Sequence, residues 1–163
     1  MLKKSSLTRG FSLSFLLLGA LAAAPAAHAL VADHSGTICK SYNANEAGYI
    51  DYLPNGICNL NSSPTAVICP TIRRTTNTNG ATIWVDVIHT GAQTTTCTAY
   101  SFNPHSSSWL ATASGSATGS GPLGITLNLV GAGKSTSVSN YSVLCTLPAN
   151  CKGIITDIDV NEP

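Results

Sequence analysis

The chain has 163 residues, of which 9% are charged and 44% are hydrophobic, and its formal net charge is +1. Three of the eight basic residues lie within the first nine positions, so the rest of the chain carries five basic and seven acidic side chains. This balance argues against nucleic acid or an anionic membrane as the partner, because both require a basic surface.

The first 29 residues have the three parts of a secretory signal peptide: a basic start, an apolar run at 11–24 and the small-residue ending AHA. The apolar run is shorter than the ~20 residues of a membrane-spanning helix. We therefore expect cleavage after Ala29, with residues 1–29 as the signal peptide and residues 30–163 as a single domain. The mature protein is expected to be secreted or periplasmic, without a membrane anchor.

The rest of the chain predicts short β-strands rather than helices. No segment carries an apolar stripe of helical period and length, whereas alternation of apolar and polar residues recurs. Gly, Pro and Asn turns separate the alternating segments. After a loose lead-in at 30–36, we expect strands at 37–42, 48–53, 56–60, 66–69, 109–113, 123–129, 141–147 and 153–160, in addition to a central hairpin. This pattern predicts an all-β domain built as an antiparallel β-sandwich, of which the jelly roll is one form.

The central hairpin is predicted at 81–102, with two strands joined by a turn at 90–93. One face of its first strand is apolar and the other is mixed, because Ile83, Val85 and Val87 alternate with Trp84 and Asp86. Farther along the chain, the segment 114–122 consists almost entirely of small residues. This composition predicts a flexible loop within the domain.

All six cysteines follow the expected cleavage site: Cys39, Cys58, Cys69, Cys97, Cys145 and Cys151. An even number of cysteines in an exported chain indicates disulfides. Of the fifteen possible pairings, strand positions favour Cys39–Cys69 between the N-terminal strands and Cys97–Cys145 between the hairpin and the penultimate strand. Cys58 and Cys151 both lie beside turns and pair by elimination. Each bridge would contribute ~3–5 kcal/mol in the chain-entropy description, so we expect a disulfide-stapled sandwich.

Common catalytic and metal-binding motifs are missing or incomplete. The segment 131–135 resembles the end of a phosphate-binding loop, but Asn128 stands where that motif requires Gly, which favours a polar turn. The sequence contains no C-x-x-C pair, and its histidines are dispersed, which argues against zinc. No G-x-S-x-G elbow is present. Two routes to a hydrolytic enzyme stay open. One is a triad assembled in space from Asp86 with His89 or His105, and the other is glycoside chemistry by paired carboxylates drawn from Asp157, Asp159, Asp51, Asp86 and Glu46.

Two groups of residues are candidates for a ligand site. Asp157 and Asp159 alternate onto one face of the last strand, where they either stay solvated or contribute oxygen ligands to calcium. No other cofactor is predicted. Trp84 and Trp109 carry rings able to stack on a sugar, and Asp86 lies on the same strand face as Trp84. Trp84 faces away from the apolar side of its strand, so it is either exposed or packed against a second sheet.

Several segments resemble a group of small exported bacterial proteins that have no assigned activity. The likeness covers most of the chain after residue 29, and it rests on Val67–Pro70 with Arg73, Thr96–Thr98, Tyr141–Cys145 with Leu147-Pro148, and Gly153, Ile158, Val160 and Glu162. In that group Cys58 and Cys151 look like an added pair, which supports their pairing here. Separately, residues 153–160 are similar to the last strand of jelly-roll carbohydrate-binding modules.

These features predict an exported β-sandwich without catalytic activity that binds an extracellular ligand such as a glycan. The ligand would contact one sheet face or the loops at 103–108 and 114–122, with Trp84, Asp86 and Trp109 as contact residues. Two other functions stay open. One is a hydrolytic enzyme that uses Asp and His residues, and the other is a secreted inhibitor or competition factor whose disulfides resist proteases.

Overall fold

The computed structural model describes residues 30–163, and the predicted signal peptide at 1–29 lies outside the described residues. Within this range the chain is mostly β-strand with two short 3-10 helices, which confirms the predicted all-β class. None of the helices in residues 30–163 is long and apolar enough to cross a membrane. The elements are β1 (Leu30–Ser35), η1 (Gly36–Ile38), β2 (Lys40–Ser41), η2 (Ala44–Tyr49), β3 (Ile50–Leu53), β4 (Gly56–Asn59), β5 (Thr65–Thr71), β6 (Thr82–Asn103), β7 (Ser108–Asn128), β8 (Asn140–Leu147) and β9 (Gly153–Glu162).

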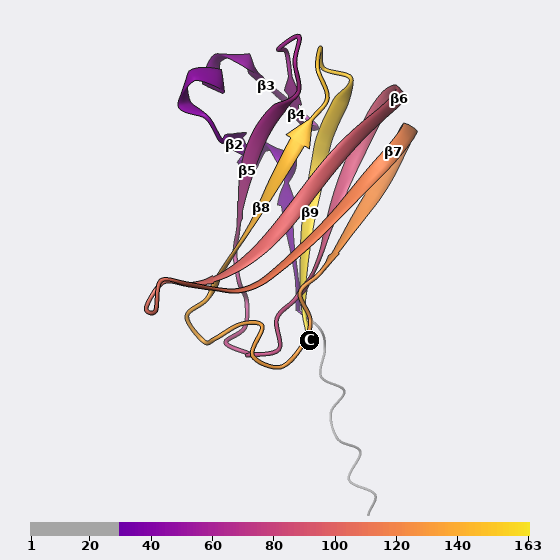
Figure 1. The fold of residues 1–163 in the computed structure, drawn as a ribbon. Coiled ribbons are helices and arrows are strands. Elements are labelled where there is room, and N and C mark those ends of the chain that lie inside the picture. Colours follow the sequence, from indigo (N-terminus) through magenta and orange to yellow (C-terminus); the bar gives the residue numbers. More distant parts are fainter. Residues whose placement is uncertain (1–29) are drawn as a thin grey trace, which may run out of the picture.

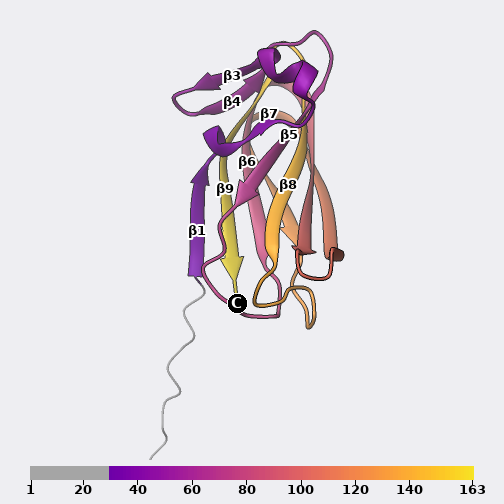
Figure 2. The same ribbon diagram turned by 90° about the vertical axis from the view of Figure 1, so that its left-hand side faces the viewer.

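The strands form two antiparallel layers that face each other (Figures 1 and 2), which confirms the predicted antiparallel β-sandwich. In the first sheet, β9 lies between β1 and the first half of β6, and that half of β6 pairs with the second half of β7. Near its start β9 also pairs with β4, which in turn pairs with β3. The second sheet has the order β2, β5, β8, second half of β6, first half of β7.

The longest strand, β6, belongs to both sheets because it bends instead of reversing, as Figure 1 shows. Its pairing with β7 is interrupted between His89 and Gln93 and then resumes with the same partner. Gly91 has a φ of 81°, a backbone conformation that glycine adopts without steric cost. The prediction of a hairpin at 81–102 with a turn at 90–93 is therefore wrong. The predicted turn is a corner of the sandwich, and the chain reverses only after Asn103.

The segment 114–122 is part of β7, so the prediction of a flexible loop there is wrong. Its small residues have a packing role, because the two halves of β7 lie against each other across the sandwich. A Cβ placed on Gly115 would lie 3.0 Å from Cγ2 of Ile125 and 3.3 Å from the carbonyl oxygen of Thr126. Glycine in a strand interior is typical of such a close backbone approach. The layers can therefore meet at this side only if the inward residues are small.

The core lies between the two layers and is reinforced by three disulfides. Buried aliphatic side chains come from β1 and from β3 to β9, and the four cysteines packed among them are fully buried. Cys39 bonds to Cys69, Cys97 to Cys145, and Cys58 to Cys151. Cys97 and Cys145 lie directly opposite each other on β6 and β8. These are the same three pairs that strand positions favour in the sequence.

The strand β1 extends the first sheet along its edge, where Figure 2 shows it beside β9. Residues 30–35 pair with residues 157–162 over the whole strand, with Asp33 opposite Asp159. Ala32 of this strand is only 2% exposed and belongs to the core. The expectation of a loose lead-in at 30–36 is therefore wrong, and the correction matters because β1 brings Asp33 to the site described below.

The last strand ends in a buried ion pair between Glu162 and Arg73. Nε of Arg73 lies 2.9 Å from Oε1 of Glu162, whose side chain is almost fully buried. The backbone N–H groups of Arg74 and Thr75 donate to Oε2 of Glu162 at 2.8 and 2.9 Å. The guanidinium of Arg73 also donates to the carbonyl oxygens of Asn77, Thr136 and Ser139. This network ties the connections before β6 and before β8 to the end of β9.

Candidate ligand-binding face and metal centre

The outer face of the first sheet gathers acidic and aromatic residues that are far apart in the sequence. Two neighbouring rows cross the strands β1, β9, β6 and β7 in that order. The first row is Asp33, Asp159, Trp84 and Thr126, and the second is Ser35, Asp157, Asp86 and Gly124. The face therefore carries four carboxylates and one tryptophan within two adjacent rows.

A local irregularity in β9 brings its two aspartates into these rows. Val87 pairs with Ile155 and Asp86 pairs with Asp157, so Thr156 has no counterpart on β6. An extra residue of this kind is a β-bulge, and it shifts which side chains point outward. Ile155 and Ile158 are fully buried, whereas Asp157 and Asp159 are half-buried on the opposite face. The bulge thus sets the phase that turns both aspartates away from the core.

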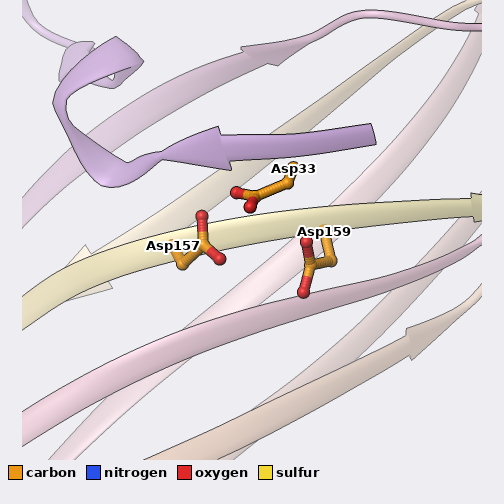
Figure 3. A group of neighbouring side chains, drawn as sticks. All are labelled: Asp33, Asp157 and Asp159. Atoms are coloured by element: carbon orange, nitrogen blue, oxygen red, sulfur yellow. The ribbon is translucent and has the colours of Figure 1, made fainter. Parts of the chain in front are cut away.

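Three of the carboxylates form a compact cluster. The side chains of Asp33, Asp157 and Asp159 each offer an oxygen, and these oxygens all lie within 4.8 Å of one another (Figure 3). Partial burial, a hydrogen bond to Asp33 and the charge of Asp159 raise the pKa of Asp157 to about 6. Partial burial and the charges of Asp33 and Asp86 likewise raise the pKa of Asp159. In both cases withdrawal from water is the larger cause, and repulsion among the negative groups adds to it.

The cluster has the chemistry of a metal site. Carboxylate oxygens are the ligands that hard cations such as Ca²⁺ prefer, and Ca²⁺ completes its six to eight ligands with further oxygens, including water. In residues 30–163, the one ion pair between side chains is Arg73–Glu162, so no Lys or Arg neutralises these three aspartates. A cation held among them would offset the negative charges that add to the rise of their pKa values. The cluster could therefore hold a metal ion.

Trp84 and Asp86 lie beside this cluster, and Asp86 also lines an open hollow. Trp84 is half-buried, whereas its strand neighbours Ile83 and Val85 are fully buried in the core. The hollow has a volume of about 310 Å³ and is lined by residues 86–88, 122–124 and Thr156. Gly124 in this lining pairs with Asp86, and a Cβ on Gly124 would be 3.6 Å from Oδ1 of Asp86.

Trp109 lies on a different face of the molecule. It faces Phe102 on the outer side of the second sheet and is 63% exposed. Its ring centroid lies 5.2 Å from that of Tyr100 and 4.9 Å from that of Phe102. The three residues predicted to contact a ligand are thus divided, with Trp84 and Asp86 together and Trp109 apart.

The residues of the hypothetical hydrolytic triad do not come together. Asp86 is exposed on the outer face of β6, whereas His89 on the same strand is buried on the inner face. His89 is held by two contacts, with Nε2 2.8 Å from Oγ1 of Thr95 and Nδ1 3.2 Å from the carbonyl oxygen of Gly119. These contacts span the corner of β6 and β7. His105 lies exposed in the turn between these strands.

Asp33 is the member of the cluster that the sequence analysis missed. The signal that could have found it is the alternation of Val31, Asp33 and Ser35 with Ala32 and His34, which is typical of an edge strand. Five residues of alternation are weak evidence alone. The pairing of β1 with β9 depends on contacts more than a hundred residues apart along the chain, and no local pattern encodes that register.

Comparison with known proteins identifies the class of fold but no family. No family model and no curated protein matches the sequence. Among solved structures, the chain is similar to the CBM36-1 domain of a multidomain xylanase from the hindgut metagenome of Trinervitermes trinervoides, with a TM-score of 0.51, 11% identity, and coverage of 82% of this chain and 98% of that one. It is also similar to the xylan-binding module CBM15, with a TM-score of 0.52, 10% identity, and coverage of 82% and 96%.

At this identity the likeness establishes the fold alone, and the fold is that of carbohydrate-binding modules. The similarity of residues 153–160 to the last strand of such modules is confirmed at the level of the fold. Both neighbours are covered almost completely, so the sandwich matches a whole module rather than a fragment of one.

Proposed function

We propose that this chain is a non-catalytic, exported glycan-binding module whose ligand contacts the outer face of the first sheet. The observation that carries the proposal is the convergence of Trp84, Asp86, Asp157 and Asp159, which occupy two adjacent cross-strand rows next to an open hollow. The fold shared with modules that include a xylan-binding one supports the same assignment. Three disulfides support export to an oxidising compartment, either the periplasm or the medium.

The chemistry of the face suits a sugar. The exposed part of the Trp84 ring offers an apolar surface on which the C–H face of a pyranose stacks. Asp86 accepts hydrogen bonds from sugar hydroxyls, and a charged acceptor strengthens such bonds. The hollow between Asp86 and Gly124 gives room for a ring or its substituent beside the stacked residue. A small number of polar groups around an apolar contact is the usual composition of a ligand site.

We propose that Ca²⁺ binds at Asp33, Asp157 and Asp159 and serves this module as a structural ion. The ion joins β1 to β9 through carboxylates on both strands, and it neutralises the charge beside Trp84. No other cofactor is proposed. Because the other three carboxylates of the face bind the ion, Asp86 stays free to contact a sugar.

Titration calorimetry with soluble xylo-oligosaccharides and a panel of other soluble glycans, in the presence of Ca²⁺, tests the proposal. We expect Trp84→Ala to weaken binding at least tenfold, which corresponds to ~1.4 kcal/mol. Gly124→Val should weaken binding similarly, because its side chain fills the hollow. We expect the fold to stay intact, because the new Cβ meets Asp86 at an ordinary contact distance. Gly48→Val is the matched control. Gly48 lies in η2, and a Cβ there would meet nothing within 4 Å.

Two results would contradict the proposal. One is that the folded wild-type protein binds no glycan of the panel. The other is that Trp84→Ala and Gly124→Val bind as tightly as Gly48→Val, which would move the site away from this face.

A further inference from the structure

The outer face of the second sheet differs from the acidic face in having no charged side chain on its β6 and β7 strands. Outward positions on β6 are threonines that lie directly opposite hydroxyl residues on β7. The facing pairs are Thr94 with Thr118, Thr96 with Ser116, and Thr98 with Ser114. All six side chains are exposed or half-buried. The face thus presents hydroxyl groups in successive rows across two strands.

Two of the three facing pairs are joined by a hydrogen bond between their hydroxyl groups. Oγ1 of Thr94 lies 2.9 Å from Oγ1 of Thr118, and Oγ1 of Thr98 lies 2.8 Å from Oγ of Ser114. Each of these two bonds uses one hydrogen, so each bonded pair keeps one hydrogen and several lone pairs for an external partner. Because a strand advances about 3.3 Å per residue, these rows recur every ~6.6 Å. The result is a regular series of donors and acceptors along the strand direction.

An aromatic platform stands at one end of these rows. Ser101 pairs with Ala111 and Phe102 pairs with Trp109, so Leu110 has no counterpart on β6. This extra residue reverses the phase of β7 and turns Trp109 outward, an effect for which β-bulges are known. Tyr100 and Phe102 contact Trp109 with tilted rings at 54° and 55°. They fix the orientation of Trp109, so little rotamer freedom is lost when a ligand stacks on it.

We propose that this face is a second glycan-binding surface, one that takes an extended, neutral polysaccharide laid along β6 and β7. One sugar ring stacks on Trp109, and the following rings meet the hydroxyl rows. The absence of charge on these two strands selects a neutral chain, and the open, regular surface favours an insoluble polysaccharide over a short oligosaccharide. The inference rests on the proposed function, which it deepens by adding a surface that does not depend on calcium.

Retention on insoluble cellulose, chitin and xylan in EDTA tests this surface, with the fraction bound measured in sedimentation assays. The wild-type protein should be retained on at least one of the three. Trp109→Ala should reduce the affinity at least tenfold, and Ser116→Lys, which places a charge within the hydroxyl rows, should do the same. Because the Trp84 face is itself proposed to bind xylo-oligosaccharides, the same comparisons are repeated in the Trp84→Ala background, where that face no longer contributes to retention. Ile72→Ala is the control for loss of an exposed apolar side chain, since Ile72 is 67% exposed away from these rows.

The outcomes separate the second surface from the proposed function. If soluble glycans bind the Trp84 face but no insoluble polysaccharide retains the wild type in EDTA, the second surface is overturned and the proposed function stands. Equal retention of Trp109→Ala, Ser116→Lys and Ile72→Ala also overturns it. If neither soluble nor insoluble glycans bind the folded protein, both proposals fail. Circular dichroism of each variant confirms that these surface changes leave the sandwich folded.

Discussion

The strand β9 carries two acidic sites of opposite kinds. Glu162 is almost fully buried, and Arg73 and two backbone N–H groups occupy its carboxylate oxygens. Asp157 and Asp159 lie only a few residues earlier, half-buried, and the nearest charged partner on β1 is another aspartate. One strand thus holds a carboxylate that is paired with a cation of the chain and, a few residues earlier, two carboxylates that have no Lys or Arg partner.

The difference separates an acidic residue whose charge is balanced within the fold from acidic residues whose charge is not. A buried carboxylate without a cation is too costly to keep, so Glu162 has to be satisfied within the chain. The aspartate cluster is tolerated because water still reaches it, yet partial burial and the repulsion of neighbouring carboxylates raise the pKa values of Asp157 and Asp159. We infer that the first site stabilises the sandwich unaided, whereas the second gains stability only from an added cation.

The largest expected effect comes from removing the cation of the internal site. Arg73→Met keeps most of the side-chain volume but leaves Glu162 buried without its partner. Breaking one side of a buried pair costs about 3–5 kcal/mol, so the free energy of unfolding in urea should fall by that amount. Adding Glu162→Gln to Arg73→Met should recover part of the loss. If Arg73→Met costs less than ~1 kcal/mol, the level typical of an exposed pair, the internal site is no stronger than a surface one.

The parts of the fold differ in how far the sequence alone predicts them. Alternation and the even cysteine count predict the sandwich and its three bridges, because these depend on local period and on strand order. The sequence predicts a turn at 90–93 and a flexible loop at 114–122, and both predictions are wrong. Glycines such as Gly91 and Gly115 are typical of turns and loops, which is why the pattern is ambiguous. Their actual roles, bending a strand and allowing two layers to touch, appear only when the partner strand is known.

The candidate site shows the same limit. Asp157 and Asp159 can be placed on one face from alternation, and Trp84 can be placed opposite the apolar side of its strand. Their meeting with Asp33 depends on the register of β1 on β9, and the bulge at Thr156 sets the phase of β9 relative to β6. Register is a long-range property, because it is decided by which apolar faces are buried together.

An intermediate effect is expected when Ca²⁺ is added to the aspartate cluster. At a free Ca²⁺ concentration of a hundred times its dissociation constant, binding to the folded state alone adds ~2.7 kcal/mol. The melting temperature should therefore rise with Ca²⁺ and return to its starting value in EDTA. Asp159→Asn should abolish most of the rise, whereas Arg73→Met should melt lower but keep it. A rise that survives Asp159→Asn would place the ion elsewhere and remove the contrast between the two sites.

The smallest effect, and the sharpest test of the repulsion itself, is the pH dependence of the calcium-free protein. The pKa of Asp157 is raised to about 6 when folded, against an ordinary value of 3.8, so the folded state binds this proton more tightly than the unfolded state. The resulting destabilisation is fully present above about pH 6 and disappears as the pH falls toward 4.

Comparing Asp157→Asn with the wild type in EDTA isolates this one group from the other titratable groups of the face. Asp33 and Asp159 act on Asp157 directly, whereas Asp86 and His34 act on Asp159. The variant lacks the charge at every pH, so it should melt higher than the wild type at pH 7, and this advantage should shrink to nothing near pH 4. In saturating Ca²⁺ the order should reverse, because the ion needs the carboxylate. An advantage that is equal at pH 4 and pH 7 would mean that packing or hydrogen bonding at residue 157, rather than charge, separates the two proteins.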